Sequence, residues 1–82
     1  MNNTARVYAM DGWTALGQAI VKQSVDDWRM AQRRRRNPHL DTKENAAMIR
    51  ECESFLRSPT PEYLTNVHGP YILKKLKEEL SA

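Results

Sequence analysis

Cysteine and histidine are the residues of this chain whose chemistry could support nucleophilic catalysis or metal binding. There is one cysteine, Cys52, and there are two histidines, His39 and His68. A nucleophile needs a base within hydrogen-bond reach, and a zinc site needs several Cys or His ligands at regular spacing. Nothing in the sequence places these three residues near one another, and it has neither a Gly-rich phosphate loop nor a paired-carboxylate motif. We therefore expect no enzyme activity, no metal site and no cofactor.

Arginine is concentrated in one short stretch of the chain. Five arginines and no acidic residue lie between residues 29 and 36, ending in Arg33-Arg34-Arg35-Arg36. Guanidinium groups bind phosphate and carboxylate through two parallel hydrogen bonds, which lysine cannot copy. The run is a candidate site for a phosphate backbone or an acidic protein surface. Its structural alternative is a solvated helix end that interacts with its own dipole and with nearby Asp or Glu.

A long helix over residues 13–36 is predicted to position these arginines. Its expected N-cap is Asp11, and it should end near Asn37-Pro38, because proline disfavours helical geometry in the residue before it. At 100° per residue one arc of the helix faces the core, and its members are Trp13, Gly17, Ile20, Val21, Ser24, Trp28 and Ala31. The other side carries a basic ridge. With the rest of the run it makes the candidate binding patch, Lys22, Arg29, Arg33, Arg34, Arg35 and Arg36.

Small residues recur every seven positions in the apolar arc, at Gly17, Ser24 and Ala31. A line of small residues lets another helix approach closely, either from the same chain or from a second copy. Together with Trp13 and Trp28 they form a candidate partner or self-association surface. The helical spacing of the two tryptophans favours the core, and the alternative is that one of them is partly exposed and anchors a partner.

Two further helices and one helical turn are expected after the arginines. Residues 41–57 form an amphipathic helix, with Asp41 as N-cap and Glu44 three residues on, which is a variant of the capping box. Its apolar face holds Met48, Ile49, Cys52, Phe55 and Leu56, with Asn45 beside them. Cys52 is therefore expected to be a buried, inert thiol.

The C-terminal third is predicted to add a short helical turn and a last helix. Thr60 should be the N-cap of the turn with Pro61 at its first helical position, and Gly69-Pro70 opens the last helix. There Ile72, Leu73, Leu76 and Leu80 share a face. The predicted fold class is all-α, a small bundle. In it the long N-terminal helix and the second helix form an antiparallel hairpin, closed by the short turn and the C-terminal helix.

Length and composition indicate one small domain over residues 1–82, in which residues 1–11 have no clear period and could be a flexible arm. The net charge is +3, and no run of 18 apolar residues or signal peptide is present, so we expect no membrane segment. A single cysteine favours a reducing, cytoplasmic setting.

Two groups of stretches carry a resemblance to known proteins. They are Asp11-Gly12-Trp13-Thr14-Ala15-Leu16-Gly17 with Ile20-Val21 and Asp27-Trp28-Arg29, then Phe55-Leu56-Arg57-Ser58 with Tyr63-Leu64-Thr65 and Tyr71-Ile72. With these stretches the chain resembles small uncharacterised proteins carried by bacteriophages and integrated mobile elements of Gram-positive gut bacteria. The resemblance covers most of the chain and brings no established activity. It implies a phage or mobile-element product that acts in the cytoplasm of a bacterial host.

Three functions follow as hypotheses. The first is a non-catalytic protein that binds a host protein or nucleoprotein complex and inhibits an antiviral defence such as a CRISPR nuclease. The second is a small DNA- or RNA-binding protein that uses the arginine run on phosphates; a helix-turn-helix is not evident, because Glu44, Glu51 and Glu53 lie where a recognition helix needs neutral or basic groups. The third is a structural or assembly protein that forms a homodimer through the Gly17, Ser24, Ala31 seam.

Overall fold

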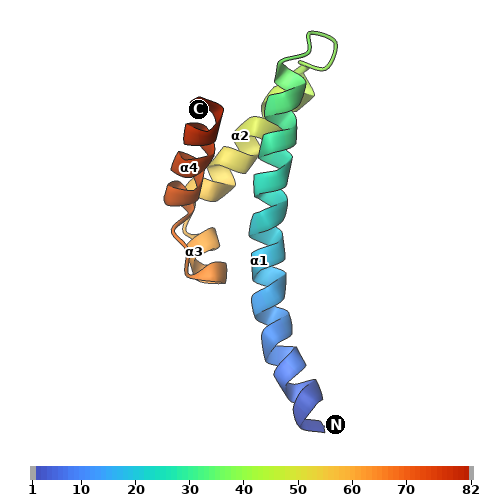
Figure 1. The fold of residues 1–82 in the computed structure, drawn as a ribbon, viewed down its shortest axis with the longest axis vertical. Helices are drawn as coiled ribbons and strands as arrows, with labels where there is room; N and C mark the ends of the chain where they lie inside the picture. Colours follow the sequence, from blue (N-terminus) through green and yellow to red (C-terminus); the bar gives the residue numbers. More distant parts are fainter. Residues whose placement is uncertain (1, 82) are drawn as a thin grey trace.

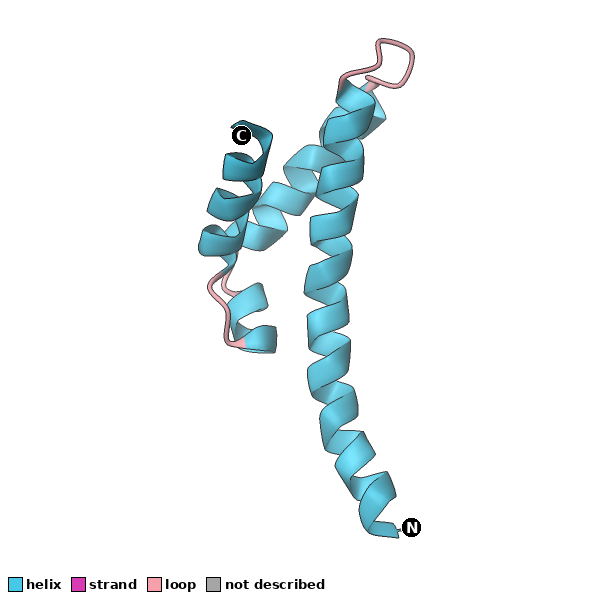
Figure 2. Cartoon of the chain, in the orientation of Figure 1, coloured by secondary structure: helices cyan, strands magenta, loops and turns pink. Residues whose placement is uncertain are grey.

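Four helices make up the part of the chain that the computed structural model describes, namely the backbone of residues 2–81 and the side chains of residues 14–81. They are α1 (Asn2–Arg35), α2 (Lys43–Arg57), α3 (Thr60–Thr65) and α4 (Gly69–Ser81), and no strand occurs among these residues (Figure 2). α2 folds back against α1 as a hairpin, α3 packs on α1, and α4 packs on α2 (Figure 1). The predicted all-α bundle is confirmed.

α1 begins eleven residues before the start that we predicted at Trp13. The predicted N-cap at Asp11 is wrong, because the backbone of this residue lies inside the helix. Residues 2–11 contain neither proline nor glycine, and extending an existing helix adds one hydrogen bond for each residue fixed. The segment can therefore be helical without an apolar period of its own. A flexible arm over residues 1–11 stays a prediction.

The length of α1 sets the shape of the molecule. A helix of 34 residues is about 51 Å long, and the molecule measures 54 Å along its longest axis and only 23 and 22 Å along the others. The radius of gyration is 15.7 Å, against about 12 Å for a compact chain of this length. The N-terminal end of α1 extends beyond the other three helices, and the α1–α2 turn forms the opposite end (Figure 1).

Asn37 organises the turn between α1 and α2. Its carbonyl oxygen accepts the backbone N–H groups of Leu40 and Asp41, each at 2.9 Å. Its side-chain oxygen accepts the backbone N–H of His39 at 3.0 Å. The turn is thus held by its own hydrogen bonds, although all its residues from Arg36 to Lys43 are exposed.

Thr42, rather than Asp41, caps the N-terminus of α2. The hydroxyl oxygen of Thr42 accepts the backbone N–H of Asn45 at 3.1 Å, in the usual N-cap geometry. The predicted capping box of Asp41 and Glu44 is wrong, because the backbone N–H of Asp41 is used in the turn at Asn37 and the helix starts one residue later. Glu44 still lies in the first turn, where its charge suits the helix dipole.

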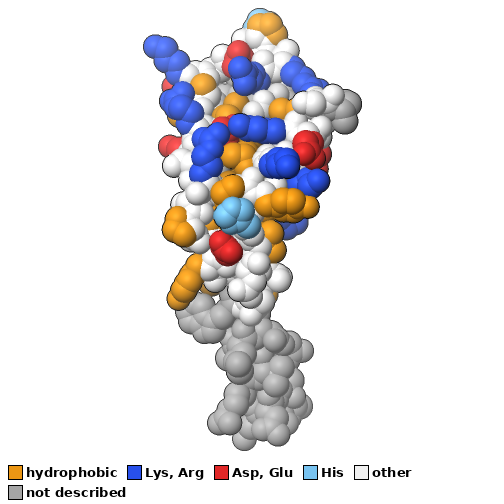
Figure 3. Space-filling model, turned by 90° about the vertical axis from the view of Figure 1, so that its left-hand side faces the viewer, with side chains coloured by type: hydrophobic (Ala, Val, Ile, Leu, Met, Phe, Trp, Pro, Cys, Tyr) orange, Lys and Arg blue, Asp and Glu red, His pale blue; other side chains and the backbone are white. Residues whose placement is uncertain are grey.

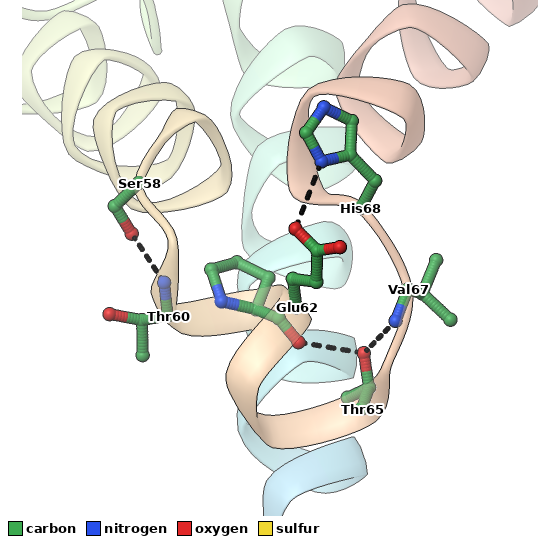
Figure 4. Close-up of polar contacts among 7 residues, drawn as sticks. Ser58, Thr60, Glu62, Thr65, Val67 and His68 are labelled. Atoms are coloured by element: carbon green, nitrogen blue, oxygen red, sulfur yellow. Dashed lines mark hydrogen bonds and ion pairs between the residues drawn. The ribbon is translucent and has the colours of Figure 1, made fainter.

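The connection from α2 to α3 depends on Ser58. Its hydroxyl donates to the carbonyl oxygen of Phe55 at 2.6 Å. It also accepts the backbone N–H of Thr60 at 3.3 Å (Figure 4). Thr60 is the first residue of α3, and Pro59 occupies the N-cap position without a side-chain hydrogen bond. The predicted N-cap at Thr60 is therefore wrong by one residue. Pro61 lies in the first turn, as expected.

Two side-chain contacts fix the path from α3 to α4. The hydroxyl of Thr65 donates to the carbonyl oxygen of Pro61 at 2.8 Å and accepts the backbone N–H of Val67 at 3.1 Å (Figure 4). His68 Nδ1 lies 3.2 Å from Glu62 Oε2. Polar contacts with α3 thereby hold the connection that leads to α4.

The core lies where α1, α2 and α4 meet. Its buried residues are Val21, Trp28, Cys52, Leu56, Leu73 and Leu76, and Val25, Ile49, Phe55 and Ile72 pack around them. Trp28 Nε1 donates to Glu53 Oε2 at 3.1 Å, so the indole is buried with its polar atom satisfied. Three residues expected on apolar faces, Ile20, Met48 and Leu80, are exposed, because the other helices cover only part of the predicted arcs.

Two glycines allow close approach of helices. A Cβ at Gly17 of α1 would lie 2.8 Å from the carbonyl oxygen of Leu64, and a Cβ at Gly69 would lie 2.0 Å from that of Leu56. Both contacts are with backbone atoms, which cannot rotate away. α3 therefore sits on α1 at Gly17, and the start of α4 sits against the end of α2 at Gly69.

Candidate functional site

The arginines at the end of α1 differ from most other basic residues in having no carboxylate partner. Five basic residues of the described part form ion pairs with carboxylates: Lys22 with Asp26, Arg29 with Glu79, Lys75 with Glu78, and both Arg57 and Lys77 with Glu53. No carboxylate among residues 14–81 pairs with Arg33, Arg34, Arg35 or Arg36, and all four side chains are exposed. These four arginines thus form no ion pair within residues 14–81, although they can still interact with the dipole of α1.

Lys43, the first residue of α2, adds a fifth unpaired cation at the same end of the molecule. We call residues 33–44 the basic tip. It holds five basic residues and two acidic ones, Asp41 and Glu44, and its excess of three positive charges equals the net charge of the whole chain. The positive charge of the protein is therefore localised at the end of the α1–α2 hairpin.

Two members of the predicted binding patch are already engaged with acids. Lys22 Nζ lies 2.7 Å from Asp26 Oδ2, and this hydrogen bond, with the charges of Lys22, Arg29 and Arg33, lowers the pKa of Asp26. Arg29 donates to both oxygens of Glu79, at 3.2 and 2.7 Å. That contact lowers the pKa of Glu79 and raises the pKa of Arg29. An incoming anion would have to compete with these carboxylates.

The run of arginines points to two sides of the hairpin. Arg29, Arg33 and Arg36 line a hollow of about 230 Å³ on the side where the end of α4 lies, together with Trp28, Gln32, Glu79 and Leu80. Arg34 lines a second hollow of about 440 Å³ between the turn and α2, together with His39, Leu40, Thr42, Glu44, Asn45 and Met48. Arg29, Arg33 and Arg36 thus line a different hollow from the one that Arg34 lines.

Asn45 connects the second hollow to the core. Its Nδ2 donates to the carbonyl oxygen of Ala31 at 2.8 Å, which ties α2 to α1. Its Oδ1 is buried and receives no hydrogen bond from the described residues. A buried acceptor without a donor costs about 1–3 kcal/mol. Sequence periodicity placed Asn45 beside an apolar face but could not reveal this acceptor.

The predicted partner surface on α1 is mostly covered by the chain itself. Gly17, Trp28 and Ala31 are buried under α3 and α2, and Ser24 is half-buried. Within the described chain the seam is thus closed by other helices at Gly17 and Ala31, and self-association through this surface stays a prediction. Trp28 fills the core, as its spacing predicted. The side chain of Trp13 lies outside the described residues.

The residues considered for catalysis lie apart. Cys52 is buried in α2, and burial, followed by the charges of Asp27, Glu51 and Glu53, raises the pKa of its thiol. His39 is in the α1–α2 turn, and His68 pairs with Glu62 before α4. Within the described part of the chain, no group of three or more His, Cys, Asp or Glu residues could hold a metal ion. The lack of enzyme activity stays a prediction.

A basic hollow between α2 and α4 was not anticipated from the sequence. Figure 3 shows the side of the molecule where α3 and α4 lie, with Lys and Arg side chains around apolar atoms. The hollow has a volume of about 610 Å³ and is lined by Arg57, Pro70, Leu73, Lys74, Lys77, Glu78 and Ser81. Arg57 and Lys77 share Glu53, so much of this positive charge is compensated locally. The basic tip remains the stronger candidate.

None of the described helices has an apolar stretch long enough to cross a membrane. Comparisons with known protein families, with curated proteins and with solved structures give no match to this chain.

Proposed function

We propose that this is a non-catalytic binding protein that contacts the phosphate backbone of a nucleic acid, alone or within a host nucleoprotein complex, through the basic tip. The observation that supports this most is the contrast between Arg33 to Arg36, which are exposed and unpaired, and the five basic residues elsewhere that form ion pairs. Unpaired guanidinium groups can neutralise phosphates without first breaking an internal ion pair.

The geometry favours phosphates over a flat acidic protein surface. Arginines on two sides of one helix end can contact anions on either side of the hairpin, and a nucleic-acid strand that passes over the tip carries a phosphate at every nucleotide. The turn is fixed by the hydrogen bonds of Asn37, so little ordering of the turn backbone is needed on binding.

The test is a binding titration of a fluorescently labelled oligonucleotide with charge-matched variants. The tip variant changes Arg33, Arg34, Arg35 and Arg36 to glutamine. The control variant makes the same loss of charge at four exposed positions outside the tip, Arg50, Arg57, Lys74 and Lys75. The proposal predicts that the tip variant loses most of its affinity while the control variant retains it. Equal losses would mean that only net charge matters, which would contradict a site at the tip.

A more specific hypothesis concerns which nucleoprotein is bound. It is that the chain is a phage-encoded inhibitor and binds an antiviral nuclease. A pull-down from host lysate, with and without nuclease treatment, addresses it directly. A protein partner that survives nuclease treatment and requires the four arginines would support it. Recovery of nucleic acid alone would leave the simpler phosphate-binding function.

A further inference from the structure

The hollow on the α2 side of the basic tip has a composition that phosphate binding alone does not explain. Two large apolar side chains, Leu40 and Met48, line it and are 48% and 39% exposed. The aromatic ring of His39 and the guanidinium of Arg34 line it as well. Its volume of about 440 Å³ exceeds what a single phosphate needs. Apolar walls, an aromatic ring and a planar cation are the groups on which nucleic-acid bases stack.

The charges of the hollow also argue against an anion at its centre. The carboxylate of Glu44 lines it, and this group would repel a phosphate but can accept an N–H group. Arg34 lines the same hollow and can hold a phosphate next to it. The hollow thus suits a flat, neutral group with N–H donors that is attached to a phosphate. An unpaired base of a nucleic-acid strand has this combination, whereas a base within a duplex has its donor edge paired and both faces stacked.

We propose that the basic tip binds single-stranded nucleic acid and that one unpaired base enters the hollow between Arg34, His39, Leu40 and Met48. This inference rests on the proposed function, because the flanking phosphates are held by the arginines of the tip. It adds a preference for single strands over duplexes and a requirement for a base at one position.

The experiment compares two labelled single-stranded oligonucleotides of equal length, one with normal bases and one in which every base is replaced by an abasic spacer. Both carry the same phosphates, so they differ only in what can enter the hollow. They are titrated with the natural chain, with Met48→Ser and with the matched control Met30→Ser. Met30 is 45% exposed on α1 and does not line the hollow. Circular dichroism and thermal melting confirm that both variants fold.

We expect the abasic strand to bind the natural chain about tenfold more weakly, the effect of losing one stacked base. Met48→Ser should weaken binding of the normal strand and reduce the difference in affinity between the normal and the abasic strand. Met30→Ser should leave this difference unchanged. Equal binding of the two strands by the natural chain would overturn the base site. So would an equal effect of the two methionine substitutions.

The two proposals fail in different ways. If normal and abasic strands bind equally and the tip variant loses both, the phosphate-binding function stands and the base site is wrong. If the tip variant binds both strands as well as the natural chain does, the phosphate-binding function is wrong, and the base site that rests on it falls too. Tighter binding to a duplex of the same length than to the single strand would also contradict the base site.

Discussion

Trp28 is the residue on which the buried part of the hairpin depends most. It is only 1% exposed, and its indole N–H donates to Glu53, which also accepts from Arg57. Glu53 is thus a carboxylate held between the core and the surface. The contact joins α1 to α2 and fixes the register of the hairpin near the start of the basic tip.

Replacing Trp28 with phenylalanine should destabilise the protein. The substitution removes a hydrogen bond to a charged group and leaves a space in the core, so we expect a loss of about 2–4 kcal/mol in the free energy of unfolding. Urea denaturation followed by circular dichroism measures it. A loss below about 0.5 kcal/mol, the range of ordinary surface substitutions, would show that this contact is not formed in solution.

At the scale of the helices, two glycines lie where neighbouring helices approach one another closely. Alanine normally favours a helix over glycine by about 1 kcal/mol. At Gly69, however, a Cβ would approach the carbonyl oxygen of Leu56 to 2.0 Å, while at Gly17 it would approach that of Leu64 to 2.8 Å. An alanine at either position would force the helices to move apart, and further at Gly69 than at Gly17.

We therefore expect Gly69→Ala to cost about 3 kcal/mol and Gly17→Ala about 1 kcal/mol, at the high and low ends of typical overpacking costs. Thermal melting of the two variants ranks them directly. If either substitution stabilises the protein, the corresponding helix contact is looser than the structure shows. If Gly17→Ala cost more stability than Gly69→Ala, the tighter helix contact would be the one between α1 and α3.

The ion pair of Arg29 with Glu79 links α1 to the end of α4, although α4 packs mainly on α2. Since this contact lowers the pKa of Glu79 below its ordinary value of 4.5, its contribution to stability is present above pH 4.5. It is lost as the pH falls through the folded-state pKa of Glu79. Glu79→Gln should thus lower the melting temperature at pH 7, and the difference should vanish in strong acid.

Glu78→Gln is the matched control, because among the side chains of residues 14–81 Glu78 pairs only with Lys75 of the same helix. Its effect on the melting temperature at pH 7 should be smaller. The same pair of variants also probes binding, since Glu79→Gln frees Arg29 for a phosphate and should strengthen oligonucleotide binding more than Glu78→Gln does. Identical effects of the two variants on affinity would show that Arg29 takes no part.

The sequence is informative about this fold wherever the signals are local. The 3.6-residue period predicts the buried faces of α2 and α4, and Pro38, Pro61 and Gly69 lie at helix boundaries as expected. Where no residue breaks the helix, as before Trp13, the start of α1 could not be found from periodicity. The caps of α2 and α3 were each displaced by one residue, because the hydrogen bonds of the preceding turns decide which residue begins the helix.

For the site, the sequence could not show which residues far apart in the chain contact one another. The arginine run is evident as composition, but which arginines are already paired depends on Glu79, fifty residues from Arg29. In the same way, the buried acceptor of Asn45 exists only because its amide nitrogen meets Ala31 on another helix. Of the six basic residues in the candidate patch, Lys22 and Arg29 are paired. The four that remain are Arg33 to Arg36, and Lys43 adds a fifth cation beside them.

At the scale of the whole molecule, apolar packing and positive charge are separated in space. α3 and α4 close the core along one part of α1, and the basic tip lies at the end of the long axis where the α1–α2 turn is exposed (Figure 1). A site at the end of a rod 54 Å long can contact a strand or the groove of a complex without a clash from the rest of the chain. This shape suits a protein that works by binding.

The salt dependence of oligonucleotide binding tests the phosphate-binding role of the tip most directly. For each arginine that contacts a phosphate of a single strand, the slope of log affinity against log salt should fall by about 0.7 when that arginine becomes glutamine. The account predicts a clearly flatter slope for the Arg33 to Arg36 glutamine variant and an unchanged slope for the charge-matched control at Arg50, Arg57, Lys74 and Lys75. The same slope for the tip variant and the natural chain would contradict it.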